Sequence, residues 1–218
     1  MLMIQLTRSG AHISVDAEAV ARLKALFARE HCIHLSRLID ADLLQIVQRR
    51  IDDSEFLPFV HVRSIGHDSD LADEFTLHIL HFVANDPRFL ELVREVTACR
   101  EIDAFHGRVY RLDPALCPVD SWHDDMADNR VVGMSLNLSR EVFAGGALQI
   151  RDRPSGRIVH EVTNTGLGAA IIFRLGHHLE HRNTTITGTI PKTAFAGWFR
   201  SNLPDYHSLV RQRGPELR

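Results

Sequence analysis

The two halves of the chain differ in how their hydrophobic residues are spaced. Up to about residue 100 the apolar positions recur every three or four residues, as at Val20, Leu23, Leu26 and Phe27, which is the period of an amphipathic helix. From Asp103 onward, short apolar stretches alternate with turn residues, as in strands. The pattern therefore predicts a mostly helical first part followed by a sheet-forming second part.

Four helices are expected in the first part. Asp16 and Asp40 each precede a segment with helical periodicity, and aspartate is a favoured N-cap residue. An Asp-Pro pair at 86–87 combines a cap with proline at the first helical position. A further helix is expected over 72–83. We expect residues 52–70 to form a loop that lies near a substrate.

Eight strands are expected in the second part, separated by glycine, proline, aspartate and asparagine turns. Eight short strands without intervening helices are typical of a double-stranded β-helix, or jelly roll. The expected fold class is therefore α+β with a mainly β core, on which the amino-terminal helical region packs. The expected strands are 104–111, 119–125, 131–138, 147–152, 157–163, 169–173, 178–186 and 192–200.

Composition is that of an ordinary globular protein. The chain has 218 residues, of which 44% are hydrophobic, and its three cysteines lack the spacing of a disulfide framework or a zinc ribbon. A reducing cytoplasm is the expected setting. Neither an export signal nor an apolar run long enough for a membrane span is recognised. A net charge of −3 with both signs interspersed argues against bulk nucleic acid binding.

The chemistry of the second part centres on His123-Asp124-Asp125. Residues i and i+2 of a strand project to one face, so His123 and Asp125 could hold one metal while Asp124 points away. A histidine from a distant strand would complete the two-histidine, one-carboxylate triad of non-haem Fe(II) oxygenases. His-x-Asp alone is a weak signal, because a strand-end histidine beside a turn aspartate has the same spacing. The candidates for the distal ligand are His177, His178 and His181.

The last expected strand indicates an anionic ligand. Lys192, Ala194, Ala196, Trp198 and Arg200 share one face by strand alternation. If that face looks into the roll, two alanines leave open volume beside a buried ammonium group. A buried cation requires an anionic partner, since an unpaired buried charge destabilises the fold. Trp198 is interpreted as part of the core wall, and Arg200 as solvated or paired.

Four segments in residues 101–201 resemble one enzyme family in their order and spacing. Residues 122–125 supply His-x-Asp, 143–152 is similar to a Gly-Gly-x-Leu strand, and 169–173 to the strand before a distal histidine. Residues 181–199 then resemble an ending of histidine, glycine, a basic residue and tryptophan. Together they resemble the Fe(II)/2-oxoglutarate-dependent dioxygenases, and among these the prolyl-4-hydroxylase-like branch.

The resemblance implies an activity and its cosubstrates. It implies hydroxylation of an unactivated C–H bond in a small-molecule, amino-acid or peptidyl substrate, with Fe(II), 2-oxoglutarate and dioxygen, release of succinate and CO2, and ascorbate as an auxiliary reductant. Related halogenating enzymes lack the carboxylate ligand. Since Asp125 is present, hydroxylation is favoured.

The resemblance also implies residue roles. The intervals to Gly188, Lys192 and Trp198 favour His181 as the distal ligand, with His178 in reserve. Lys192 is implied to bind the distal carboxylate of 2-oxoglutarate. Most family members carry arginine there, often followed two residues later by serine, so the lysine and Ala194 imply partly different hydrogen bonding. Tyr110 is implied to contact the cosubstrate, unless it is a core-rim tyrosine.

The expected organisation is a helical region over 1–100, the dioxygenase core over 101–201 and a tail over 202–218. The alternative function is a non-catalytic cupin-like protein that holds a metal or a small acid. A binder does not need a buried cation, so Lys192 favours the enzyme. Neither the substrate nor the oligomeric state follows from the sequence. The zinc-like histidine pairs 31/34 and 78/81 are interpreted as coincidences in a chain with 14 histidines.

Overall fold

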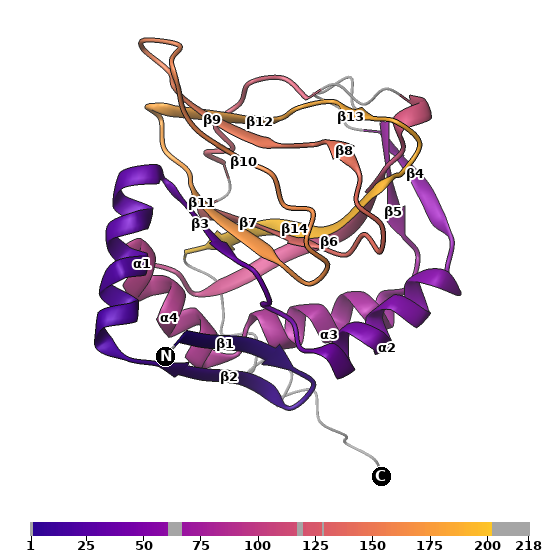
Figure 1. Cartoon of the computed structure of the whole chain (residues 1–218), viewed down its shortest axis with the longest axis horizontal. Coiled ribbons are helices and arrows are strands. Elements are labelled where there is room, and N and C mark those ends of the chain that lie inside the picture. The colour runs from indigo at the N-terminus through magenta and orange to yellow at the C-terminus, as the bar shows by residue number, and fades with distance from the viewer. Residues whose placement is uncertain (1, 61–66, 117–119, 128, 202–218) are drawn as a thin grey trace.

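The computed structural model describes residues 2–60, 67–116, 120–127 and 129–201, and shows a two-sheet fold resting on helices (Figure 1). A seven-stranded sheet runs through the middle of the molecule. The helices lie against one of its faces, and a smaller sheet covers the other (Figure 1). Strands of both sheets face the space between them, and the candidate site residues of the second half lie there.

Each sheet is antiparallel throughout. The larger sheet contains, in spatial order, β3 (Cys32–Leu35), β11 (Ala170–Arg174), β7 (Arg130–Asn137), β14 (Lys192–Arg200), β6 (Ala104–Leu112), β5 (His67–Leu71) and β4 (Phe56–Val60). The smaller sheet contains β10 (Ile158–Val162), β9 (Leu148–Asp152) and β12 (Leu179–Asn183). Two short pairs complete the strands: β8 (Ala144–Gly145) with β13 (Ile186–Thr187), and β1 (Leu2–Thr7) with β2 (Gly10–Val15).

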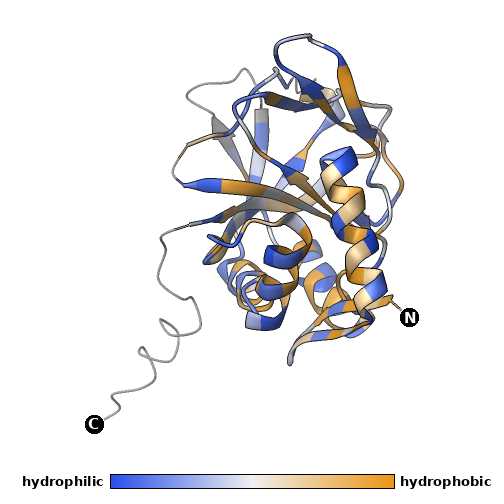
Figure 2. Ribbon diagram, turned by 90° about the vertical axis from the view of Figure 1, so that its left-hand side faces the viewer, coloured by the Kyte–Doolittle hydropathy of each residue, from blue (hydrophilic) through white to orange (hydrophobic). Residues whose placement is uncertain are grey.

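Three of the four helices begin directly after the aspartates that the sequence indicates as caps, and α3 begins two residues after the expected 72. Asp16 caps α1 (Ala17–Glu30), Asp40 caps α2 (Ala41–Asp52), Asp73 caps α3 (Glu74–Ala84) and Asp86 caps α4 (Pro87–Thr97). Each aspartate accepts a hydrogen bond from a backbone N–H of the first turn. Hydrophobic and hydrophilic residues occur together on each helix, as expected for helices that cover a core (Figure 2).

The main core lies between the helices and the larger sheet. Phe195 and Phe199 of β14 are buried there against Phe105 of β6, with ring centroids 5.3 and 4.9 Å apart. Phe89 of α4 completes the cluster at 6.2 Å from Phe199. Because residues alternate along a strand, Lys192, Ala194, Ala196 and Trp198 of the same strand face the second sheet.

Several expected elements differ from the structure. The segment 52–70, expected to be a loop, contains β4 and β5 in its described part, and both join the larger sheet. β1, β2 and β3 were not expected in the mostly helical first part. The expected strand at 119–125 is wrong: 120–127 follows an irregular path with a single bridge between His123 and His181, and 117–119 lies outside the described residues. The expected strand 178–186 divides into β12 and β13.

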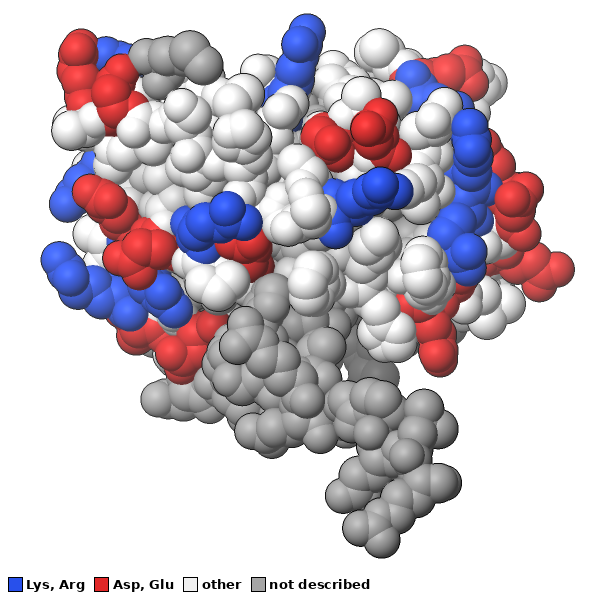
Figure 3. Space-filling view, turned by 90° about the horizontal axis from the view of Figure 1, so that it is seen from below, with Lys and Arg blue, Asp and Glu red and all other residues white. Residues whose placement is uncertain are grey.

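The surface gives little indication of a single partner class. On the face seen from below, acidic and basic side chains are interspersed (Figure 3). Across the described ranges, the helices are all too short or too polar to cross a membrane.

Candidate metal centre

His123, Asp125 and His181 lie together between the two sheets. Each offers one ligand atom, and these atoms lie within 4.8 Å of one another. Asp125 Oδ2 is 3.3 Å from His181 Nε2 and 3.6 Å from His123 Nε2. Two imidazole nitrogens and one carboxylate oxygen form the donor set of a facial iron triad. The residues present therefore fit a single Fe(II) ion.

The triad is assembled by an irregular segment and not by strand alternation. His123 is fixed by backbone hydrogen bonds in both directions with His181, at 3.1 and 2.8 Å. Asp125 has a left-handed backbone, with φ 53°, which aspartate tolerates better than most residues. Asp124 lies apart from the triad, where its carboxylate accepts from Met126 N and meets Arg153. The predicted i, i+2 geometry was thus wrong, although both residues reach the site.

Stacking holds the irregular segment in place. The guanidinium groups of Arg151 on β9 and Arg182 on β12 both stack on the Trp122 ring, at 4.3 and 4.5 Å from its centroid. Arg151 is itself paired with Glu180 of β12 at 2.6 Å. Because Trp122 directly precedes His123, these contacts anchor the first ligand to the smaller sheet.

The hydrogen bond on the far side of His123 sets which nitrogen faces the site. Nδ1 lies 2.6 Å from the carbonyl oxygen of Ser121, which can only accept, so Nδ1 carries a hydrogen. Nε2 is then the atom presented to a metal, as is usual for ligand histidines. Asp120 supports the same ring at 3.5 Å and also accepts from the backbone of Asn183.

Without a metal, the triad holds a proton. Burial opposes the charge on His123, but its hydrogen bond to Asp125 and the charges of Asp120 and Asp125 raise its pKa to about 9. Burial likewise opposes ionisation of Asp125, yet hydrogen bonds from His123 and His181 hold the pKa of that carboxyl well below its usual range. A metal cation would displace this proton, since histidine ligands bind in the neutral form.

Two further residues hold the Asp125 carboxylate. Trp198 Nε1 donates to Oδ2 at 2.9 Å, and Arg130 meets Oδ1 at 3.3 Å. The Arg130 guanidinium also stacks on the Trp198 ring at 3.7 Å. The sequence-based interpretation of Trp198 as core wall missed its hydrogen bond to Asp125. The place of Trp198 on the same strand face as Lys192 could have indicated this role. Arg130 carried no such signal.

Lys192 is buried in the same space. It is 4% exposed, and Nζ donates to Asn183 Oδ1 at 3.1 Å and to the Gly146 carbonyl at 3.2 Å. Within the described part of the chain, no carboxylate lies within 4 Å of Nζ. Burial lowers the pKa of Lys192 to about 8, with partial opposition from the charge of Asp120. Asn183 and His181 lie two residues apart on β12, so one strand face connects the ammonium group with the triad.

Tyr110 lies across from Ala194 in the pairing of β6 with β14. The residue is half-buried, and an interaction with the Ser135 side chain favours its ionised form. Burial raises the pKa of Tyr110 to about 12, so the hydroxyl stays neutral and can donate. Since Ala194 is on the Lys192 face, Tyr110 faces the space between the sheets.

Solved structures share this architecture, although no protein-family model and no curated protein matches the sequence. A prolyl-4-hydroxylase from Pseudomonas putida aligns with a TM-score of 0.60 and 19% identity, over 84% of this chain and 99% of that one. An oxidoreductase of the 2OG-Fe(II) oxygenase family from Burkholderia pseudomallei gives 0.58 and 14%, over 92% and 100%. The 2-oxoglutarate-dependent epimerase SnoN of nogalamycin biosynthesis gives 0.60 and 14%, over 85% and 82%.

The chain has the double-stranded β-helix fold of the 2-oxoglutarate/Fe(II) oxygenases. At these identities the likeness establishes the fold, and the reaction has to be argued from the site. A prolyl-4-hydroxylase and an epimerase both align with this chain, so proteins that share the fold can differ in the reaction that their names give.

The other histidines that the sequence offered as ligands lie outside the triad. His177 is largely exposed, 4.0 Å from Asp124, and the His178 ring packs 6.4 Å from that of His31. Neither joins the group of ligand atoms. Of the zinc-like pairs, His34 is hydrogen-bonded to Asn164, and His81 to the backbone of Gly107.

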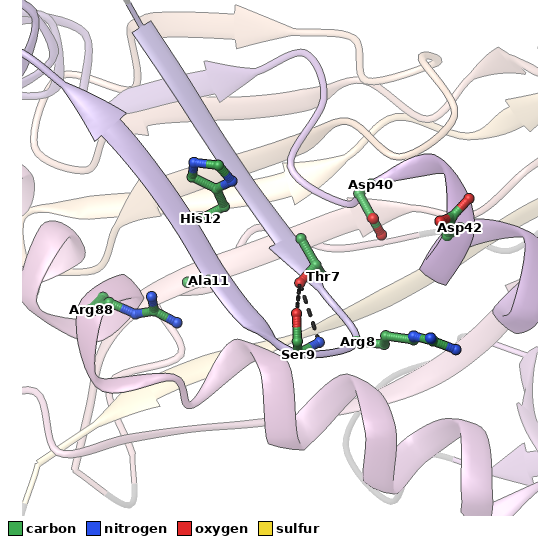
Figure 4. A pocket seen from close by; sticks show the side chains of 8 residues that line it. All are labelled: Thr7, Arg8, Ser9, Ala11, His12, Asp40, Asp42 and Arg88. Carbon is green, nitrogen blue, oxygen red and sulfur yellow. Dashed lines mark hydrogen bonds between the residues drawn. The ribbon is translucent and has the colours of Figure 1, made fainter.

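A surface hollow of about 510 Å³ lies at the β1–β2 hairpin, on the helical side of the oxygenase fold (Figure 4). Several of the polar groups that line the hollow already make hydrogen bonds or ion pairs with neighbouring residues. Thr7 bonds to Ser9, Asp40 caps α2, and Arg88 pairs with Asp86. The convergent ligand atoms and the buried ammonium make the triad, and not this hollow, the functional candidate.

Proposed function

We propose that this protein is an Fe(II)- and 2-oxoglutarate-dependent dioxygenase that hydroxylates an unactivated C–H bond, releasing succinate and CO2. The observation that carries the proposal is that the triad and the buried Lys192 face one interior and are joined through β12. A metal alone would require only the triad. A dicarboxylic keto acid requires both, because one end chelates the metal and the other needs a cation.

Each residue then has a defined task. His123, Asp125 and His181 would hold iron, and bound Fe(II) would supply the activation of dioxygen. Lys192 would pair with the distal carboxylate, and the Tyr110 hydroxyl would donate a hydrogen bond to the cosubstrate. Trp198 and Arg130 keep the Asp125 carboxylate oriented.

Apolar residues of both sheets exclude water next to the triad. Ile150 of β9 and Ile171 and Phe173 of β11 belong to the second, smaller core of the molecule. The Phe173 ring lies 4.9 Å from that of His181. Low water content strengthens the Lys192 interaction with an anion and protects the reaction from side products.

The proposed substrate class, cellular compartment and domain division rest on the sequence. The substrate class remains a small molecule, an amino acid or a peptidyl residue. A reducing cytoplasm suits Cys32 and Cys99, which are free thiols. We retain the division into a helical region over 1–100 and a roll over 101–201, whereas the expected tail over 202–218 lies outside the described residues.

The decisive experiment is uncoupled turnover. Purified protein, reconstituted anaerobically with Fe(II), should show a changed iron spectrum on addition of 2-oxoglutarate, and should form succinate when air and ascorbate are supplied. His181→Ala should abolish both signals, and Asp124→Ala serves as the matched control that keeps them. If wild type shows neither signal while still binding metal, the chain is a cupin-like binder.

A further inference from the structure

A buried amide group with an unused donor faces the same interior as Lys192. Asn137 lies at the end of β7 and is 1% exposed. Its Oδ1 accepts from Ser139 N at 3.0 Å, which fixes the orientation of the amide. Nδ2 has no hydrogen-bond partner among the residues that the structure describes. Because an unpartnered buried donor destabilises a fold, such a group indicates a ligand or an ordered water.

Strand pairing places this amide beside the proposed cosubstrate site. Ala194 of β14 pairs with Tyr110 on one side and with Asn137 on the other. The three residues therefore form a row across the sheet on the face that also carries Lys192. Ala194 is fully buried and short, so it leaves space between its two neighbours.

The distances between strand positions allow one ligand group to reach both donors. Directly opposite residues have Cβ atoms about 5 Å apart, and diagonal neighbours lie roughly 7–8 Å apart. Lys192 is diagonal to Asn137, because it stands two residues before Ala194. A carboxylate between their side chains would lie within reach of both.

The number of free donors matches one carboxylate. Two of the three N–H groups of Lys192 go to Asn183 and Gly146, which leaves one. Asn137 Nδ2 supplies a second donor. We propose that Asn137 binds the distal carboxylate of 2-oxoglutarate, with Nδ2 donating to one oxygen while Lys192 pairs with the other. This inference rests on the proposed function and assigns a further residue to it.

The test is a comparison of two ligands on one variant. Asn137→Asp keeps an acceptor for Ser139 N, removes the donor and adds a negative charge. Binding is measured by calorimetry on the Fe(II)-loaded protein without oxygen. The probes are 2-oxoglutarate and 2-oxopentanoate, which has a methyl group in place of the distal carboxylate. We expect the variant to bind 2-oxoglutarate about 10- to 100-fold more weakly, as for a lost hydrogen bond to a charged group, and 2-oxopentanoate as wild type does.

Gln48→Glu is the matched control. Gln48 is a buried amide of α2 that donates to the carbonyl oxygen of Leu138 at 2.8 Å, from the opposite side of the sheet. It therefore tests whether an acid introduced next to this strand end weakens binding by disturbing the fold. We expect Gln48→Glu to lower the unfolding temperature without changing the affinity for 2-oxoglutarate.

The outcomes separate this inference from the proposed function. Unchanged 2-oxoglutarate affinity in Asn137→Asp, or equal weakening of both ligands, overturns the role of Asn137. Failure of wild type to bind 2-oxoglutarate overturns the proposed function instead. If Asn137→Asp does not fold, the role of Asn137 is tested by nuclear magnetic resonance on the wild-type protein loaded with a diamagnetic metal. The signals observed are the side-chain amide resonances of Asn137. They should shift with 2-oxoglutarate and stay in place with 2-oxopentanoate, and a shift with neither ligand overturns the role.

Discussion

At the level of single residues, burial decides what the charged groups of the site can do. Lys192 is 4% exposed, and burial lowers its pKa from 10.5 to about 8. The protonated lysine therefore destabilises the folded state. Between about pH 8 and 10.5 the unfolded chain still binds the proton that the folded protein has lost, so stability rises with pH across this window.

Replacing Lys192 by methionine should separate stability from binding. Removing the buried charge relieves a cost on the order of 3 kcal/mol. The Gly146 carbonyl and the Asn183 amide oxygen then lose a donor, at about 1 kcal/mol each. We expect Lys192→Met to be about 1 kcal/mol more stable than wild type in urea unfolding at pH 7, and to lose 2-oxoglutarate binding. A clearly less stable variant would show that Lys192 already has an anionic partner in the free protein.

Replacing Trp198 by phenylalanine should weaken metal binding. The change removes the N–H that donates to Asp125 but keeps a ring on which Arg130 can stack. Loss of a hydrogen bond to a metal ligand typically lowers metal affinity about 10- to 100-fold. Trp122→Phe is the control, because the Trp122 ring stacks on Arg151 and Arg182 and not on the triad. Equal metal affinity in the two variants, measured by titration with Fe(II) or Mn(II), would remove Trp198 from the site.

The sequence predicted the residues of the triad better than the way they meet. The His-x-Asp motif and the resemblance predicted that His123, Asp125 and His181 come together, and strand alternation predicted the face of Lys192, whereas the roles of these residues stay predictions. The orientation of Asp125 depends on a left-handed residue and on Arg130 and Trp198, which come from β7 and β14. Those contacts depend on tertiary packing, which spacing along the chain does not encode.

At the level of elements, β14 organises the molecule. It pairs with β6 on one side and β7 on the other, and its two faces supply the main core and the site. Gly197 lies opposite Gly107 in this pairing. A Cβ atom at Gly197 would collide with the carbonyl oxygen of His106. Two glycines therefore permit the close approach of β6 and β14 beneath α3.

We expect Gly197→Ala to destabilise the protein by about 2–4 kcal/mol, because backbone atoms must move to admit the methyl group. Gly156→Ala is the control. Gly156 differs from Gly197 in having a positive φ, of 68°, and its Cβ would meet open space, so only about 1–2 kcal/mol of backbone strain is expected. Urea unfolding measures both variants. A smaller loss for Gly197→Ala than for Gly156→Ala would contradict the close approach.

The elements that the sequence misjudged have identifiable reasons. β5 has the sequence His-Asp-Ser-Asp-Leu, and aspartate and serine rarely favour strands. It is a strand because Asp68 and Asp70 both pair with Arg108 of the neighbouring β6. That is a tertiary effect. The β1–β2 hairpin was predictable, since apolar and polar residues largely alternate on both sides of the Arg8-Ser9 turn, which Gly10 follows.

At the level of the whole molecule, one hydrophobic core joins the two parts of the sequence. Its members come from the β1–β2 hairpin, all four helices of the described chain and the larger sheet. β3, β4 and β5 of the first hundred residues pair into that sheet. The helical region therefore supports the site directly, because it packs behind the strand that carries Lys192 and Trp198.

We expect the protein to unfold in one cooperative transition. The chain has two tryptophans, Trp122 and Trp198, and both adjoin the triad, whereas far-ultraviolet circular dichroism mainly reports the helices. Fluorescence and circular dichroism should therefore give the same urea midpoint for the metal-free protein. Separate midpoints would show that the roll and the helical layer fold independently.

The left-handed backbone at Asp125 has a consequence for how this site could evolve. Glycine adopts a φ of 53° more readily than aspartate, so exchanging Asp125 for glycine would add no backbone strain. The codons of the two residues differ by a single base. Losing the carboxylate would leave two histidines and one more open position for an exogenous anion on the iron. Selection for a different reaction could therefore begin at this residue without first rebuilding the backbone that presents it.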